Sequence, residues 1–165
     1  MGFIAKPYPV KTAQIVDANV TKPKMAALGQ QISSVSGTWS GGSGSLGNVP
    51  NLTLTITTTG RPVWVGLVSA ANDSYVGVNS TTGAGNCNGS VGFAVDGSSQ
   101  GCMEFGINAT ASASISQTIL PPSSFQQVLY GLVAGTYTIT CQAKENTGYS
   151  TVAIYHCLLM AYEID

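Results

Sequence analysis

The sequence predicts an all-β fold, a jelly-roll β-sandwich of about eight strands with an extended N-terminal arm. From Leu52 onward, short segments rich in β-branched and aromatic residues alternate with turns of Gly, Pro, Asn and Asp. No segment has the apolar spacing of a long amphipathic helix. The stretch from Ser150 to Tyr162 contains neither Gly nor Pro, which predicts one long closing strand.

The expected strands follow one another at short intervals along the chain. They are 52–59, 62–69, 90–96, 102–108, 111–120, 125–132, 135–144 and 150–164. A further short strand is expected around Val35 and Trp39, before a Gly- and Ser-rich stretch that resembles a linker. Residues 70–90 are expected to form polar loops, with Gly83 to Gly89 exposed.

The closing strand has an unusual pattern, because both of its faces are apolar. Side chains alternate between the two faces of a strand, so polar residues are expected at every second position when one face meets water. Here neither set of alternate residues is polar, which predicts that a second copy of the chain covers the face that the sandwich leaves open. Alternation alone does not tell which face is which. The residues expected in the core or the interface are Tyr155, His156, Cys157, Leu158, Leu159, Met160 and Tyr162.

The composition favours a protein packed among others. Only 8% of the 165 residues are charged, against about 25% in ordinary soluble domains. The net charge of −1 argues against a nucleic-acid partner. No stretch approaches the roughly 18 apolar residues of a membrane span, so no membrane insertion is expected, and no targeting segment is visible.

Residues 1–32 are expected to form a separate basic arm, ahead of a jelly-roll domain at 33–165. The arm carries four lysines and one acid, Asp17. One helical turn around Pro23 would place apolar side chains on a shared face. We expect the arm to dock on a larger acidic partner; a solvated tail, or a short contact with the chain's own domain, is the alternative. The docking residues are expected to be Lys6, Lys11, Lys22, Lys24, Met25 and Leu28.

No catalytic site, metal site or cofactor is expected. The lone histidine, His156, lies among apolar residues without a nucleophile motif, and is expected to be a buried, hydrogen-bonded structural residue. The carboxylates are scattered over turns and strand ends. The four cysteines show no close pairing, which argues against zinc. They are Cys87, Cys102, Cys141 and Cys157, expected as reduced buried thiols, with disulfides formed after release from a host cell as the alternative.

Four segments resemble, in order, the TNF/C1q-like jelly-roll modules of bacteriophage fibre and decoration proteins. They are NLTLTITTTGRPVWVGLVS, ILPPSSF, AGTYTITCQAK and LLMAYEI, and the resemblance covers about residues 33–165. The turn from Thr58 to Val63 and the element from Ala134 to Thr138 are its more specific pieces. Upstream, IVDANVTKPKMAALGQQIS resembles the segments that precede such modules in phage fibres. The resemblance implies a homotrimer whose inner sheets, each with its closing strand, surround a threefold axis. The sequence departs from those of the fibre proteins, because it contains no shaft repeats.

These observations together predict a non-enzymatic virion structural protein of a tailed bacteriophage. It would be a homotrimeric capsid decoration or cement protein, or a short head fibre, attached through its arm. Its partners would be itself and the major capsid protein or another virion protein. It would be assembled in the host cytoplasm and located on the capsid surface or in a fibre. The alternative is the receptor-binding tip of a tail or collar fibre, which would contact a host surface glycan through residues 70–90.

Overall fold

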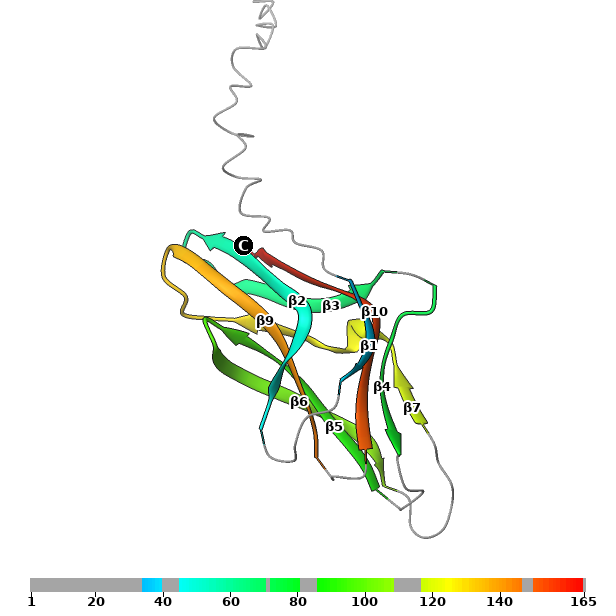
Figure 1. Ribbon diagram of the computed structural model, residues 1–165. Coiled ribbons are helices and arrows are strands. Elements are labelled where there is room, and N and C mark those ends of the chain that lie inside the picture. The colour runs from blue at the N-terminus through cyan, green and yellow to red at the C-terminus, as the bar shows by residue number, and fades with distance from the viewer. Residues whose placement is uncertain are drawn as a thin grey trace, which may run out of the picture.

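The computed structural model describes residues 34–39, 45–70, 72–80, 86–108, 117–146 and 150–164. These residues form two antiparallel sheets packed face to face (Figure 1), which confirms the expected all-β, jelly-roll-like sandwich. The arm at 1–32, with its six expected docking residues, lies outside the described residues.

The two sheets are called sheet A and sheet B. Sheet A contains β1 (Ser34–Trp39), β3 (Val63–Ser69), β4 (Tyr75–Ser80), β7 (Gln117–Leu120), β8 (Gln126–Leu129) and β10 (Ser150–Glu163). Sheet B contains β2 (Gly47–Thr58), β9 (Gly135–Glu145), β5 (Asn86–Val95) and β6 (Ser98–Asn108), in that spatial order.

Several strands of sheet A lie end to end. Strand β1 pairs with one edge of β10 over residues 152–158, so β3 and β4 must share the opposite edge. Strand β8 pairs with β3 and strand β7 with β4, and a short 3₁₀ turn, Pro122–Ser124, lies between them in the chain. The strands therefore occupy four positions in each sheet, as in an eight-stranded jelly roll. The closing strand β10 lies in the middle of sheet A.

The core fills the space between the sheets. On β2, the buried side chains of Leu52, Leu54 and Ile56 alternate with exposed threonines. Phe93 from sheet B and Leu67 from sheet A are also fully buried. Each such side chain contributes about 1.5–3 kcal/mol through burial. This alternation explains why the strand pattern could be recognised in the sequence.

The outer face of sheet B is polar. Threonines of β2 stand directly opposite threonines of β9, and two of these cross-strand pairs are hydrogen-bonded: Thr53 to Thr140 at 3.2 Å and Thr57 to Thr136 at 3.0 Å. Such pairs stabilise neighbouring strands and also meet water. Sheet B is therefore complete without a further protein layer.

Some element boundaries differ from those expected. Residues 70–90 are not all loop, because β4 and the start of β5 lie within them. Strand β2 begins at Gly47, inside the Gly- and Ser-rich stretch. Asp96 and Gly97, at φ 47° and 82°, form a tight turn that lets β6 begin already at Ser98. The first part of the expected strand at 111–120 lies outside the described residues.

The uninterrupted alternation expected for the closing strand is wrong at His156. Cys157 pairs with Val35, but Tyr155 pairs with the next residue, Ser36, so His156 is an extra residue in β10. Its φ of 45° marks a bulge, which shifts the side-chain phase by one position. The buried side chains are Val152 and Ile154 before the bulge, and Cys157, Leu159 and Ala161 after it.

Candidate functional site

The outer face of sheet A is mainly apolar, unlike that of sheet B. We call its half-buried aromatic and aliphatic side chains the apolar face; the exposed Ile119 and the polar Asn79, Gln126 and Thr151 lie on the same side of the sheet. The apolar face consists of Trp64, Val68, Tyr75, Val128, Tyr155, Leu158, Met160 and Tyr162. Glu163 at the end of β10 is the one carboxylate in the six described strands of sheet A. An apolar face of this kind is typical of interaction surfaces.

Two aromatic pairs fix the ends of the apolar face. Trp64 stacks on Tyr162 with ring centroids 5.0 Å apart, and Tyr75 stacks on Tyr155 at 5.3 Å. The Trp64 indole N–H donates to Oε1 of Gln126 at 3.0 Å, and its ring leans over Gly66, where an added Cβ would lie 2.7 Å from it. Stacked pairs contribute about 0.5–1.5 kcal/mol beyond their burial. The face is therefore ordered before any partner binds.

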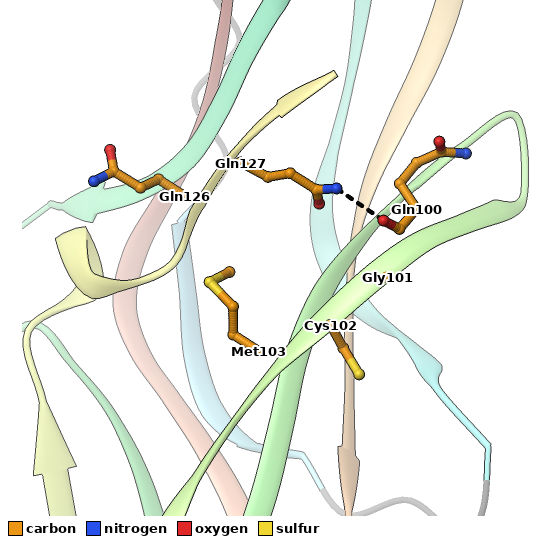
Figure 2. Close-up of a pocket in the computed structure, with 6 residues that line it drawn as sticks. All are labelled: Gln100, Gly101, Cys102, Met103, Gln126 and Gln127. Carbon is orange, nitrogen blue, oxygen red and sulfur yellow. Dashed lines mark hydrogen bonds between the residues drawn. The ribbon is translucent and has the colours of Figure 1, made fainter. Parts of the chain in front are cut away.

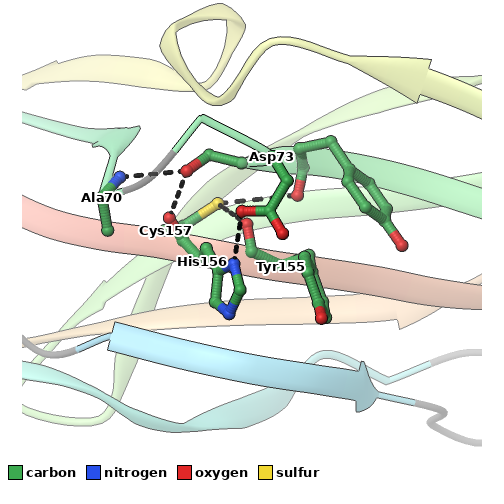
Figure 3. Close-up of polar contacts among 7 residues, drawn as sticks. Ala70, Asp73, Tyr155, His156 and Cys157 are labelled. Carbon is green, nitrogen blue, oxygen red and sulfur yellow. Dashed lines mark hydrogen bonds and ion pairs between the residues drawn. The ribbon is translucent and has the colours of Figure 1, made fainter.

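The bulge places a polar group in the middle of the apolar face. Nδ1 of His156 lies 2.6 Å from a carboxylate oxygen of Asp73, and its ring packs on Tyr155 with centroids 4.1 Å apart (Figure 3). The hydrogen bond to His156 lowers the pKa of Asp73. The His156 carbonyl accepts bonds from the Ala70 N–H at 2.9 Å and the Ser74 hydroxyl at 2.5 Å.

These contacts partly correct the sequence interpretation of His156. The residue is hydrogen-bonded, as expected, but its side chain is 32% exposed rather than buried. Asp73 and Ser74 were not expected at the site. They lie more than 80 positions before His156 in the chain, and only the turn between β3 and β4 brings them to β10.

Glu163 closes one end of the sandwich. Its carboxylate accepts hydrogen bonds from the Thr58 hydroxyl and from the backbone N–H and hydroxyl of Thr59, the last at 3.0 and 3.1 Å. Partial burial raises the pKa of Glu163, but these bonds and one from the Arg61 backbone outweigh it and lower the pKa below its ordinary 4.5. The carboxylate therefore joins the end of β10 to the turn after β2.

Glu163→Gln is expected to lower the free energy of unfolding by about 1 kcal/mol at neutral pH. Because the folded-state pKa is lowered, the stabilisation is fully present above about pH 4.5 and is lost as the pH falls through the folded value. Urea unfolding of both proteins at equal concentration, at pH 7 and pH 3, measures this. Glu104→Gln, at an exposed position of β6, is the control. Equal stability of wild type and E163Q at pH 7 would contradict the role.

A shallow groove of about 200 Å³ lies between the edges of β6 and β8 (Figure 2). It is lined by Gln100, Gly101, Cys102, Met103, Gln126 and Gln127. The Gln127 side-chain amide donates to the Gln100 carbonyl at 2.8 Å and bridges the two sheets. The groove is smaller than the 300–1,000 Å³ of typical ligand pockets. Its lining contains no carboxylate, lysine or histidine, so it offers no acid–base pair for catalysis.

The described thiols differ in exposure. Cys141 and Cys157 are buried, as expected, and burial raises the pKa of Cys157 to about 11 and that of Cys141 further. Cys102 is exposed, contrary to expectation, because its side chain lies beside the groove. The side chain of Cys87 lies outside the described residues. Of these three free thiols, only that of Cys102 is open to reagents.

Cys102→Ser is therefore expected to remove one fast-reacting thiol per chain. In native wild type, an aromatic disulfide reagent should react with Cys102 within minutes, and with Cys141 and Cys157 only after unfolding. Stopped reactions followed by peptide mass spectrometry identify the labelled residues. Fast labelling of Cys141 in the native protein would contradict its burial.

The structure separates the closing-strand residues into three groups. Tyr155, Leu158, Met160 and Tyr162 belong to the apolar face, Cys157 and Leu159 to the core, and His156 to the bulge. Within the described ranges, no three His, Cys, Asp or Glu side chains of one chain gather closely enough to hold a metal ion. Nor does that part of the chain contain a helix long and apolar enough to cross a membrane.

No protein-family model and no curated protein sequence matches the chain. Among solved structures, a cycloisomaltooligosaccharide glucanotransferase of Paenibacillus sp. is 15% identical with a TM-score of 0.32. That match covers 82% of this chain, which spans only 17% of the glucanotransferase. The family 35 carbohydrate-binding module of Cellvibrio japonicus Abf62 is 13% identical, with a TM-score of 0.27, over 84% of this chain and 96% of the module. A family 35 carbohydrate-binding module from an environmental isolate is 17% identical, with a TM-score of 0.24. That match covers 81% of this chain and 86% of the module. TM-scores this low establish no relationship beyond two-sheet β architecture.

Proposed function

We propose that this chain is a non-enzymatic structural protein that assembles as a homotrimer through its apolar face and serves in a phage virion as a capsid decoration or short head-fibre protein. The observation that carries the proposal is the contrast between the two outer faces. Sheet B presents hydrogen-bonded threonines to water, whereas sheet A presents mainly aromatic and aliphatic side chains. Burying the apolar face is favourable at about 25 cal/mol per Å².

A second copy of the chain suits this face better than a charged partner. The described strands of sheet A contain no lysine, no arginine and one carboxylate, which is already bound by Thr58 and Thr59. Apart from the Asp73–His156 pair, the described residues of this face carry no charge, and an apolar surface is matched by another apolar surface, which symmetric self-association supplies. The expectation of three chains per assembly comes from the resemblance to TNF/C1q-like phage modules.

The two segments that carry this resemblance most specifically form a single corner of the sandwich. Gly60, in the Thr58–Val63 turn, lies beside Ala134, where an added Cβ would be 3.4 Å from the Ala134 nitrogen. Glu163 binds the same turn from the closing strand. Three distant parts of the sequence thus meet at one corner, which supports the view that they belong to one structural unit.

The first test is the mass of the purified protein by native mass spectrometry. We expect three times the 16.9 kDa chain mass; a monomer at micromolar concentration would overturn the trimer. The second test is the copy number in purified virions, which should be high for a decoration protein and low for a fibre tip. Absence from virions would overturn both. Deleting residues 1–32 should leave a trimer that no longer binds empty capsids.

The receptor-binding tip remains the second candidate, favoured by the groove between β6 and β8. Its amide side chains carry donors and acceptors without charge, as a neutral glycan requires. Binding of the purified protein to host surface polysaccharide, lost in Gln127→Ala and kept in Glu104→Gln, would support this candidate over decoration. A low virion copy number would point the same way.

A further inference from the structure

We propose that three copies of His156, one from each subunit, bind a single divalent transition-metal ion on the threefold axis. The inference rests on the proposed homotrimer and adds a ligand to it. The ion would be Zn²⁺ or a close relative such as Ni²⁺ or Co²⁺, because imidazole nitrogen suits these metals.

The imidazole of His156 is hydrogen-bonded to a carboxylate on one side of its ring. Metal-binding histidines usually donate one ring N–H to a carboxylate, which fixes the tautomer and leaves the second nitrogen as the ligand. Asp73 occupies this position, 2.6 Å from Nδ1. Nε2 has no partner in the described part of the chain and points away from Asp73 (Figure 3).

Neighbouring residues hold both the backbone and the ring of His156 in place. The backbone of His156 has a φ of 45°, which is strained for a residue other than glycine. The Ala70 N–H and the Ser74 hydroxyl bind its carbonyl, and the Tyr155 ring packs against its imidazole. A metal ligand needs a fixed direction, which the Asp73 hydrogen bond and the Tyr155 ring give the imidazole.

His156 lies near the middle of β10, the strand that has neighbours on both edges at this point. In a symmetric trimer, three equivalent side chains can share one ion only at the axis. Three neutral imidazoles form a known ligand set for zinc, with a fourth position open to water. The spacing of the cysteines argued against a zinc site built from one chain. It does not bear on a site whose ligands come from three chains.

The test is native mass spectrometry of the full chain, stripped with EDTA and then supplied with Zn²⁺ or Ni²⁺. We expect one ion per three chains in wild type and none in His156→Gln. Asp73→Asn should lower the affinity about 10–100-fold, while both variants remain trimers. Co²⁺ should give the visible absorption of a tetrahedral site in wild type only.

Each outcome is decisive. A trimer that binds no ion, or that binds it equally in H156Q, overturns the metal site and leaves the proposed assembly intact. One ion per chain overturns the shared site. A monomer in the same spectra overturns the proposed function and the shared site together.

Discussion

Leu158→Asp is expected to give a folded monomer, whereas Leu159→Ala is expected to lower the free energy of unfolding by about 2–5 kcal/mol. The two residues are adjacent in the chain but lie on opposite faces of β10, because the bulge at His156 fixes the phase beyond it. Leu159 is fully buried in the core, and Leu158 belongs to the apolar face.

The physical reasons for the two effects differ. Removing most of the Leu159 side chain leaves a cavity between the sheets. In the proposed trimer, an aspartate at position 158 would add three carboxylates to a mainly apolar interface that already holds three copies of Asp73, where like charges cost several kcal/mol. Native mass spectrometry measures the assembly of Leu158→Asp, and urea unfolding measures the stability of Leu159→Ala.

Thr55→Asp is the matched control for the charge. Thr55 is exposed on the outer face of sheet B, so the variant should stay folded and trimeric. If Leu158→Asp also stays trimeric, the apolar face is not the interface. If Leu159→Ala costs less than about 1 kcal/mol, the phase assigned to β10 is wrong.

Gly92→Ala is expected to lower the free energy of unfolding by about 3 kcal/mol. A Cβ at Gly92 would lie 2.1 Å from the carbonyl oxygen of Gly101 and 3.0 Å from the Cα of Cys102. Both are backbone atoms of β6, so relief requires the β5–β6 hairpin to open. Urea unfolding followed by circular dichroism measures the loss.

Gly135→Ala is the control for this variant. An added Cβ there would meet only the Tyr137 ring, at 3.6 Å, which is ordinary van der Waals contact. Alanine also reduces the backbone freedom of the unfolded chain. The free energy of unfolding of G135A should therefore stay within about 1 kcal/mol of wild type. Equal losses for G92A and G135A would contradict the close approach of β5 and β6.

The fold was predictable where local pattern and burial agree. The alternation of Leu52, Leu54 and Ile56 with threonines reports a sheet with one wet face, and turn residues mark most strand ends. Strand β4 was missed because its short Tyr75–Ser80 segment contains a glycine and lies in a polar region. Its place is set by pairing with β10.

The candidate site was predictable only in part. The pattern of the closing strand predicted an apolar face. The bulge was not predictable, because a residue other than glycine rarely adopts a positive φ and no Gly or Pro marks this position in the strand. The Asp73 contact depends on how the turn after β3 folds over that bulge, which is a tertiary property.

The position of β10 also constrains the order of synthesis and folding. Ser34 of β1 pairs with Leu158, and Val63 of β3 pairs with Glu163. Sheet A therefore lacks its central strand, β10, until residues 150–163 have left the ribosome. Before that moment β1 and β3 lack the neighbour that joins them, and nascent chains cannot present a finished apolar face to one another. A chain truncated before Ser150 is therefore expected to lack the strand that joins β1, β3 and β4, and to fail to form sheet A.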